Sequence, residues 1–377
     1  MKTTKRILFV NQSSGYLMYD LVNSEVFNSF DKVFFKGTSN NKQKELIGKV
    51  KVIDTVSYRN SNIFWRFFTW FIASFHLWIL IVFKYRKSHI FFTSNPPIAH
   101  FIAAVLKLNF SVLVLDVYPD VLTRSGVLSK ENFLVSRFQK LNSKIYTHAR
   151  RIYTLSEGMK KVLVNYVDES KIQVIPLWGD DDNLIKIRKN ENEFLKKLGL
   201  QDKFILLYSG NMGLTHPIEI LDKIAEKIEN TAIHILAIGG GPKYKPLNDF
   251  AKKNHSKNIT VLPWQDRHLL SEIISAADLG VVTSDSRIAD ISVPSKLFNL
   301  LQLHIPILAV GHEDSELNYI VNKFELGKCF NESQLDLIID YILKCYGDKT
   351  FLNQLMDNTK IAVPFFSKIN LLSIDIN

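Results

Sequence analysis

Residues 293–310, VPSKLFNLLQLHIPILAV, hold the start of a helix and a buried strand within one short stretch. Apolar residues recur at helical spacing after Pro294, and IPILAV (305–310) is a continuous apolar run of the kind found in strands covered on both faces. A surface helix can carry a lysine at any position, so the role of Lys296 depends on what surrounds it. A helix that leads into a buried strand predicts one unit of an α/β fold.

The same alternation of short apolar runs and helical patterns extends along the whole chain. Helices such as 217–229 and 268–277 separate the later strands. Strands that alternate with helices in this way predict parallel, doubly wound sheets. The expected strands are 6–11, 32–37, 89–94, 111–117, 151–156, 204–210, 233–239, 258–263, 279–284 and 305–310.

The length of the chain and one acidic stretch predict two domains. A chain of 377 residues is long for a single hydrophobic core. The segment VIPLWGDDDNL (174–184) indicates a linker, so we expect one domain over residues 1–183 and a second from residue 184. Asp180, Asp181 and Asp182 could instead form a set of metal ligands, but a solvated linker is the favoured interpretation.

Composition excludes several classes of protein. Hydrophobic residues make up 46% of the chain and charged residues 22%, which is typical of a globular protein and not of a disordered one. The two cysteines, Cys329 and Cys345, provide neither a disulfide framework nor a metal-ligand spacing. The start MKTTKRILFVNQ lacks the long apolar core of a signal peptide, so we expect a cytoplasmic protein.

The positive charge of the chain is confined to its first half. Residues 1–182 hold 25 Lys and Arg against 14 Asp and Glu, and the remainder holds 22 against 23. The first half therefore has a net charge of +11 and the rest −1, which together give the +10 of the whole chain. This excess predicts an anionic neighbour: phospholipid, nucleic acid or a phosphorylated substrate.

The segment IFWRFFTWFIASFHLWILIVF (63–83) favours phospholipid among these neighbours. Three interpretations compete for it: a buried core helix, a helix in the membrane interface, and a true membrane span. The uninterrupted part is short for a span, and three tryptophans next to the basic KYRK (84–87) favour the interface. Nucleic-acid binding, which disperses aromatics among basic residues, is not expected. The residues predicted to contact the acceptor or the membrane are Trp65, Arg66, Phe68, Trp70, Phe71, Lys84, Arg86, Lys87 and Arg124.

Four loops in the second half follow consecutive expected strands. Ligands of doubly wound sheets bind at the carboxyl ends of the strands, where such loops lead into helices. The loops belong to YSGNMGLTHPIEIL (208–221), IGGGPKYKPL (238–247), LPWQDRHLL (262–270) and PSK (294–296).

The residue types in these loops predict a site for a diphosphate. Gly210 and Gly213 allow backbone amides to approach a ligand closely. The backbone amides of Ser295 and Lys296 would cap an anion, and the ammonium of Lys296 would neutralise it. Trp264 and Gln265 are the candidates to flank the base of a nucleotide, although a core position for the tryptophan is the simpler alternative.

The second half resembles the retaining GT-B glycosyltransferases of the family-4 type, which build bacterial surface polysaccharides. The segments YSGNMG, IGGGP, NITVLPWQ, AADLGVVTS and VPSKLFNLLQLHIPILAV carry this resemblance, and FFTSNPPIAHFIA, VLDVYPDVL, IYTLSEGMKKVL and VIPLWGD extend it more loosely into the first half. The resemblance implies two Rossmann-like domains with parallel sheets that face each other across a cleft. The C-terminal domain (184–350) would bind a nucleotide sugar, the N-terminal domain (1–183) an acceptor, and residues 351–377 would pack back on the N-terminal domain.

The resemblance also implies roles for individual residues. Lys296 would stabilise the leaving diphosphate, and Asp116 would orient or deprotonate the acceptor. Many members carry an Arg and a Lys after the first glycine and two glutamates farther on. Here those places hold Asn211, His216, Ile291 and Asn299, so Arg287 or Arg124 would have to assist Lys296. The donor-binding residues implied are Ser14, Gly15, Gly210, Asn211, Gly240, Trp264, Gln265, Pro294, Ser295, Lys296 and Asn299.

The expected protein is a metal-independent, cofactor-free, retaining glycosyltransferase at the inner face of the cell membrane. It would transfer a hexose or N-acetylhexosamine from a nucleotide sugar, with a UDP-sugar favoured, to a polyprenyl-diphosphate-linked glycan. A UDP-sugar 2-epimerase of the same fold is one alternative, but it leaves the aromatic block unexplained. A degenerate partner subunit without activity is the other alternative.

Overall fold

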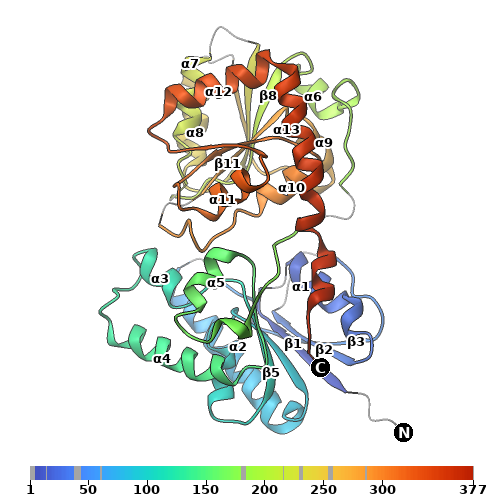
Figure 1. Cartoon of the computed structure of the whole chain (residues 1–377), viewed down its shortest axis with the longest axis vertical. Helices are drawn as coiled ribbons and strands as arrows, with labels where there is room; N and C mark the ends of the chain where they lie inside the picture. The colour runs from blue at the N-terminus through green and yellow to red at the C-terminus, as the bar shows by residue number, and fades with distance from the viewer. Residues whose placement is uncertain are drawn as a thin grey trace. The chain divides into compact units, whose positions relative to one another are not determined.

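The chain forms two compact units in a computed structural model that describes residues 5–13, 15–37, 44–59, 62–179, 184–214, 216–228, 232–253, 258–284 and 287–376. The first unit comprises Met1–Pro176 and Lys368–Asn377, and the second comprises Leu177–Ser367 (Figure 1). The returning segment therefore joins the first unit from Lys368, later than the expected residue 351. The helix α13 (Lys349–Ala362) still belongs to the second unit.

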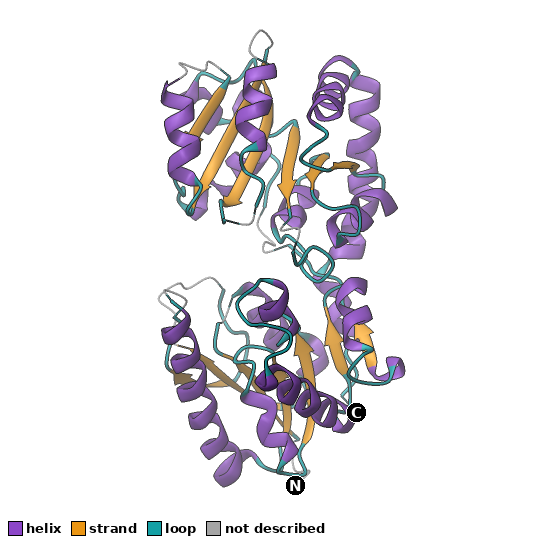
Figure 2. Ribbon diagram, turned by 90° about the vertical axis from the view of Figure 1, so that its left-hand side faces the viewer, coloured by secondary structure: helices purple, strands orange, loops and turns teal. Residues whose placement is uncertain are grey.

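The first unit is built on a seven-stranded parallel sheet with strand order β3-β2-β1-β4-β5-β6-β7. Helices flank the strands on both faces (Figure 2). The strands are β1 (Arg6–Asn11), β2 (Asp31–Gly37), β3 (Val50–Thr55), β4 (His89–Thr93), β5 (Asn109–Val114), β6 (Ile152–Thr154) and β7 (Ile172–Val174). The helices are α1 (Tyr16–Asn23), α2 (Ile63–Leu80), α3 (Asp120–Arg124), α4 (Phe133–His148) and α5 (Glu157–Leu163).

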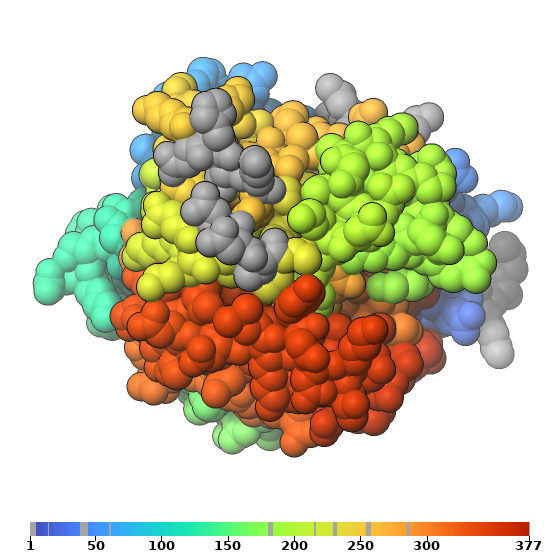
Figure 3. All heavy atoms as spheres, turned by 90° about the horizontal axis from the view of Figure 1, so that it is seen from above, coloured from blue at the N-terminus to red at the C-terminus, as the bar shows by residue number. Residues whose placement is uncertain are grey.

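The second unit repeats this plan with six parallel strands in the order β10-β9-β8-β11-β12-β13. The atoms of its last two helices form one continuous surface, red in Figure 3. The strands are β8 (Phe204–Asn211), β9 (Ile233–Gly240), β10 (Ile259–Leu262), β11 (Leu279–Thr283), β12 (Ile307–Val310) and β13 (Gly327–Phe330). The helices are α6 (Glu193–Leu198), α7 (Ile220–Lys227), α8 (Tyr244–Lys253), α9 (Leu270–Ser275), α10 (Lys296–Gln302), α11 (Glu316–Lys323), α12 (Leu335–Gly347) and α13.

These two sheets confirm the predicted α/β class with two Rossmann-like domains. In each sheet the strand order reverses beside the first strand, between β1 and β4 and between β8 and β11. Such a reversal leaves a crevice at the carboxyl ends of the two strands, because their crossover helices lie on opposite faces of the sheet. In the second unit this point is bordered by Asn211 and by the loop that leads to Lys296.

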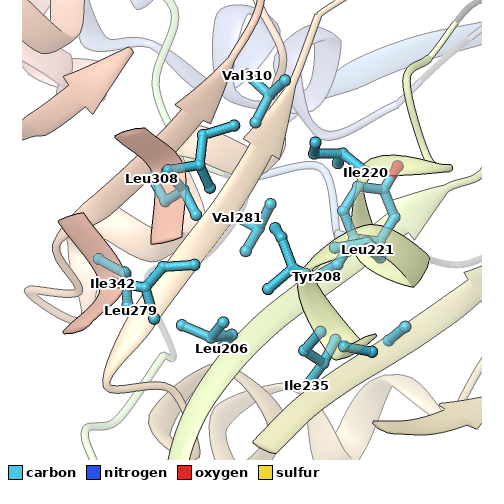
Figure 4. Close-up of a cluster of buried hydrophobic side chains, with 14 of the residues drawn as sticks. Leu206, Tyr208, Ile220, Leu221, Ile235, Leu279, Val281, Leu308, Val310 and Ile342 are labelled. Carbon is cyan, nitrogen blue, oxygen red and sulfur yellow. The ribbon is translucent and has the colours of Figure 1, made fainter. Parts of the chain in front are cut away.

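The core of the second unit explains why its central strands are continuous apolar runs. Side chains from β8, β9, β11 and β12 meet those of α7 and α12 in one buried cluster (Figure 4). Tyr208, Val281 and Leu308 are each at most 1% exposed in this cluster. Because both faces of these strands are covered by helices, alternation of polar and apolar residues is absent.

The aromatic segment forms α2, which packs on the first unit with one side only. The side chain of Asn62 caps the helix by accepting a hydrogen bond from the backbone N–H of Trp65 at 2.9 Å. Thr69, Ala73, Ser74 and Leu77 are buried, and a single π-helical turn (Ile81–Tyr85) continues the helix. The opposite side is an exposed apolar stripe of Phe64, Phe68, Phe71, Phe75, Ile79, Val82 and Phe83.

This one-sided packing bears on the three interpretations of residues 63–83. A fully buried core helix is wrong, because Phe68 is 45% and Phe71 54% exposed. Among the residues that the structure describes, the helix Ile63–Tyr85 has the length and the apolar composition needed to cross a membrane. About a third of its most apolar part is buried against the rest of the protein.

The end of the chain is fastened to the first unit by the edge of its sheet. The hydroxyl of Tyr153 donates a hydrogen bond to the carbonyl of Asp375 at 2.7 Å and accepts one from its N–H at 3.0 Å. The side-chain amide of Gln173 donates to the carbonyl of Ser373 at 3.1 Å. These bonds hold residues 373–375 beside β6 and β7.

Candidate functional site

Lys296 is the first residue of α10 and lies at the carboxyl edge of the second sheet. Its ammonium Nζ is 4.0 Å from the centre of the Tyr208 ring, a cation–π contact with a residue of β8. The side chain as a whole is only partly buried, but Nζ is shielded from solvent and has no hydrogen-bond partner among the described residues. A shielded ammonium without a carboxylate or carbonyl partner is costly, which indicates that an anion belongs beside it.

Burial changes the titration of this lysine. Desolvation disfavours the charged form and lowers the pKa of Lys296 to about 7. The ammonium is therefore poised near neutral pH, and a phosphate placed beside it would raise its pKa again. The charge on the site thus depends on whether an anion is bound.

Glycines create the space in front of Lys296. Gly210 has φ +150°, and a Cβ there would lie 3.4 Å from the Cε of Lys296. Gly239 has φ +154°, and a Cβ there would lie 1.9 Å from the carbonyl oxygen of Gly210. The ends of β8 and β9 therefore approach so closely that only glycine fits at the second position. The backbone N–H of Met212 continues this approach by donating to the carbonyl of Gly240 at 2.7 Å.

Trp264 lies against the same glycine loop. A Cβ at Gly240 would be 2.6 Å from the Trp264 Nε1, so the indole packs directly on the backbone. The tryptophan is nevertheless 61% exposed, which rules out the core position considered for it. The side-chain amide of Gln265 donates to the carbonyl of Pro263 at 2.9 Å and so is bonded within its own loop. The exposed indole forms a flat surface on which a nucleotide base can stack.

The structure separates the remaining predicted donor residues into two groups. Asn211 and Ser295 are exposed near the crevice, and Pro294 and Asn299 are partly buried at the start and middle of α10. Ile291, which occupies the place of a carboxylate in many family members, is 2% exposed and packs as a core residue. No carboxylate therefore stands at that position of the site.

A small cavity next to this group was missed by sequence reasoning. It has a volume of about 240 Å³ and opens at the carboxyl ends of five strands of the second sheet. The Nζ of Lys243 lines it and donates to the carbonyl of His216 at 2.7 Å and to Glu219. The buried hydroxyl of Ser284 also lines it and has no partner among the described residues. Ser284 and the cavity residue His312 follow strands without glycine-rich turns, and they lie outside the four loops that the sequence indicated.

Thr283 connects the cavity to the lysine. Its hydroxyl lies 3.3 Å from the Nδ1 of His216, which lines the cavity. The same side chain hydrogen-bonds the Tyr208 hydroxyl, which also donates to the carbonyl of Asn211 at 2.7 Å. His216, for which the resemblance implied a lysine, therefore contributes to the site through this chain of polar side chains.

In the first unit, Asp116 follows β5 and lies beside Arg66. Its backbone N–H donates to the hydroxyl of Ser94 at 3.0 Å. Crowding by neighbouring protein raises the pKa of the Asp116 carboxyl, and the positive charge of Arg66 lowers it. This crowding is the larger of the two effects, so the pKa of the Asp116 carboxyl lies above its ordinary value.

Arg66 lies within electrostatic reach of Asp116 and of two tyrosines. Its Nε is buried without a hydrogen-bond partner among the described residues, while the guanidinium acts electrostatically on Tyr58, Asp116 and Tyr118. The ring of Trp70 stacks on Tyr58 with centroids 6.0 Å apart and meets Tyr118 edge-on at 5.5 Å. Trp70 is 2% exposed, so the prediction that it contacts the membrane or the acceptor is wrong. Its position fixes the two tyrosines that surround Arg66.

The other predicted residues of the first unit are dispersed. Gly15 precedes α1 with an open environment, since a Cβ there would meet no atom within 4 Å. Ser14 lies outside the described residues, as do Asp180, Asp181 and Asp182. Arg124 ends α3 and is partly buried. Trp65, Phe68 and Phe71 are exposed on α2, and Lys84, Arg86 and Lys87 are exposed at its far end.

Comparisons with known proteins agree with this architecture. Residues 190–361 match the family model described as Glycosyl transferases group 1. The chain is 23% identical to the probable glycosyltransferase WbjE of Pseudomonas aeruginosa over 226 residues, which is 59% of this chain and 56% of that protein. It is 22% identical to the putative colanic acid biosynthesis glycosyl transferase WcaI of Escherichia coli K12, over 50% of this chain and 47% of that protein. The chain thus spans about half the length of these curated relatives.

Solved structures extend the likeness to the whole chain. The crystal structure of Anabaena Alr3699/HepE in complex with UDP and glucose superposes with a TM-score of 0.70 over 97% of both chains, at 14% sequence identity. A likeness of this kind at such low identity shows the fold. The expected GT-B fold, with two Rossmann-like domains, is therefore confirmed.

Proposed function

We propose that this protein is a glycosyltransferase that transfers a sugar from a nucleotide-diphosphate sugar, with a UDP-sugar favoured, to a precursor of a surface polysaccharide. The observation that carries the proposal is the shielded, unpartnered ammonium of Lys296 beside the glycine turn at the crevice between β8 and β11. The match of residues 190–361 to group 1 glycosyl transferases supports the reaction class. The UDP in the similarly folded Alr3699/HepE supports the choice of nucleotide.

The chemistry follows from where charge develops. Departure of the nucleoside diphosphate leaves positive character on the anomeric carbon and adds negative charge to the phosphate oxygens. Lys296 would stabilise that charge together with backbone amides near Gly210, and stabilisation that grows in the transition state raises turnover. We propose that this arrangement suffices without a metal ion and that transfer proceeds with retention of configuration. Trp264 would stack on the base.

We place the acceptor at the carboxyl edge of the first sheet. Asp116 is positioned to orient or deprotonate an acceptor hydroxyl, and the adjacent guanidinium of Arg66 lacks a partner for its Nε. A guanidinium so placed suits an anionic group, and a polyprenyl diphosphate provides one beside the sugar that is to be extended. A lipid-linked glycan is therefore the acceptor class that we propose.

We further propose that α2 holds the protein on the inner face of the cell membrane without crossing it. Its exposed stripe places Phe64, Phe68, Phe71 and Phe75 along one side of a helix whose other side is committed to the protein core. A lipid-linked acceptor would then reach the first unit without leaving the bilayer. A helix of this kind lies in the interface with its apolar side among the upper acyl chains.

The decisive experiment is a screen of nucleotide sugars by thermal shift, followed by hydrolysis and transfer assays on those that bind. Lys296→Ala should lower turnover on the order of 10²-fold or more and weaken donor binding less, because the charge that it meets grows in the transition state. Lys296→Arg, which keeps a cation, is the matched control and should retain more activity. Absence of turnover with every nucleotide sugar would reject the proposal, and an unchanged turnover number in Lys296→Ala would reject the role of the lysine.

The membrane proposal is tested with vesicles. Replacing Trp65, Phe68 and Phe71 with Ser should reduce the binding that persists at high salt, because that part depends on apolar area. Circular dichroism checks that the variant folds. Alkaline carbonate should release the wild-type protein from membranes, and protein that stays in the pellet under carbonate would contradict an interfacial position.

A further inference from the structure

A second charged feature of the first unit lies at the edge of the sheet opposite to Asp116. A hollow of about 500 Å³ opens at the amino ends of β1, β2 and β3, where the π-helical turn after α2 arrives. Arg6, Lys49, Lys51 and Lys84 line it, together with one acidic residue, Asp31.

The cations of this hollow are not neutralised by the protein. None of these four basic side chains has a carboxylate within ion-pair distance among the described residues. The close approach of the Lys51 ammonium, and after it the like charge of Arg6, lowers the pKa of Lys84. Lys32 also lines the hollow, but its ammonium donates to the carbonyl of Val22 at 2.9 Å. The remaining cations repel one another unless an anion lies between them.

Tyr85 adds an unsatisfied polar group to this hollow. It lines the hollow and is 1% exposed, and its hydroxyl has no hydrogen-bond partner among the described residues. Arg6 and Lys84 lie over its ring, with Cζ 6.0 Å and Nζ 5.8 Å from the ring centre. A buried hydroxyl without a partner costs free energy, which an anionic oxygen would recover.

The surroundings of the hollow identify the anion. Val82 and Phe83, 46% and 84% exposed, directly precede Lys84 and end the apolar stripe of α2. A soluble anion would not require an apolar surface beside its site. A phospholipid presents both chemistries together, since its phosphate sits immediately above its acyl chains.

We propose that this hollow binds the phosphate head group of an anionic phospholipid, while the exposed stripe of α2 lies among the acyl chains of the same leaflet. This inference rests on the membrane association proposed above and assigns a specific site to the lipid. Because α2 and its π-helical turn run from Arg66 to Lys84, the lipid site lies about 27 Å along the helix from the proposed acceptor site, at 1.5 Å per residue. Two separate contacts at the two ends of α2 would fix its direction on the membrane surface.

The test compares two variants that lose the same charge. Lys51→Gln with Lys84→Gln empties the hollow of two cations, and Lys130→Gln with Lys144→Gln removes two exposed cations elsewhere in the first unit. Sedimentation is measured with vesicles of phosphatidylcholine alone and with 30% phosphatidylglycerol. Each lysine near an anionic surface contributes about 1 kcal/mol, or about fivefold in affinity. The double variant of Lys51 and Lys84 (the hollow pair) should therefore bind the anionic vesicles about 30-fold more weakly than the wild type. The double variant of Lys130 and Lys144 (the control pair) should lose much less affinity.

The outcomes separate this site from the membrane association itself. If the two lysine pairs lose affinity equally while replacing Trp65, Phe68 and Phe71 with Ser still reduces binding, the head-group site is overturned and the association stands. If the wild-type protein binds neither vesicle, both are overturned. A thermal shift by inorganic phosphate that the hollow pair abolishes, without any difference between the pairs on vesicles, would assign the hollow to a soluble anion. Circular dichroism and a melting temperature close to that of the wild type show that each variant is folded. Lys84→Gln alone, a change at an exposed side chain, replaces the double variant of Lys51 and Lys84 if that variant fails to fold.

Discussion

The lowered pKa of Lys296 makes the binding of UDP, the leaving group after transfer, depend on pH in a way that can be calculated. With a pKa of about 7 in the free protein, half of the Lys296 side chains carry a proton at pH 7. If a bound diphosphate restores the ordinary value of 10.5, binding takes up a proton whenever the pH lies between these two values. The affinity for UDP should therefore fall by about 50-fold between pH 7 and pH 9, or about 2.3 kcal/mol.

The assay is titration calorimetry with UDP over this range. UDP suits the range because its terminal phosphate, with a pKa near 6, is already ionised. Repeating the titration at pH 8.5 in two buffers of different ionisation enthalpy should show an uptake of about one proton for each UDP bound. Lys296→Arg keeps its charge throughout, so its affinity should be flat with pH. Lys296→Met should bind UDP weakly at every pH.

The free energy of unfolding provides a second check, because it should rise with pH whereas the affinity for UDP should fall. The folded-state pKa of Lys296 lies below that of the unfolded chain, so the unfolded state binds more protons between about pH 7 and 10.5. The free energy of unfolding of the ligand-free protein should therefore rise with pH over this window, and Lys296→Met should remove that rise. A wild-type affinity for UDP that stays constant from pH 7 to 9 would refute the reasoning, because it would mean that the ammonium is not the group that meets the phosphate.

Three further predictions concern the glycine turn, the exposed tryptophan and the need for a metal ion. Gly239→Ala should lower the free energy of unfolding, measured by chemical denaturation, by about 3 kcal/mol or more, because its Cβ would lie 1.9 Å from the Gly210 carbonyl oxygen. Gly15→Ala is the control: open space surrounds Gly15, so the free energy of unfolding should change by less than about 0.5 kcal/mol. Trp264→Ala should weaken UDP binding by about 1–3 kcal/mol in calorimetry and leave the melting temperature almost unchanged, since the indole is 61% exposed; equal affinity would show that no base stacks there. Sugar transfer should persist in excess EDTA, and a loss that Mg²⁺ or Mn²⁺ restores would return the run Asp180–Asp182 to consideration as metal ligands.

The central strands were predictable from sequence, and three of the four edge strands were not. All ten expected strands are present with small shifts at their ends, because a strand covered on both faces is a continuous apolar run. The three strands that were missed, β3, β7 and β13, are all edge strands. In β3, VKVIDT, charged residues interrupt the apolar ones, and only one of its six residues is buried. An edge strand needs fewer apolar contacts, so its sequence carries a weaker signal.

The candidate site was predictable where glycine marks it. The turns at Gly210 and Gly240 marked two of the loops at the carboxyl ends of the strands, and the lysine after Pro294 followed from the helix that begins there. The contact of the Lys296 ammonium with the Tyr208 ring could not be predicted. Tyr208 belongs to a strand almost ninety residues earlier in the chain, and no local sequence pattern shows that the two residues meet. The buried position of Trp70 was mispredicted because α2 is apolar on both sides, so no polar stripe shows which side faces the protein.

The bonds between Tyr153 and Asp375 have a consequence for synthesis on the ribosome. Most of the first unit is made before residue 177, but β6 and β7 receive these hydrogen bonds only after residues 373–375 have been synthesised. The second unit contains all its strands by residue 330 and its last helix by residue 362, so it can complete its fold while the first unit still waits for its final segment. The domain that begins the chain is thus the last to be finished, and until then the Tyr153 hydroxyl and the sheet edge around it lack the partners that the end of the chain supplies.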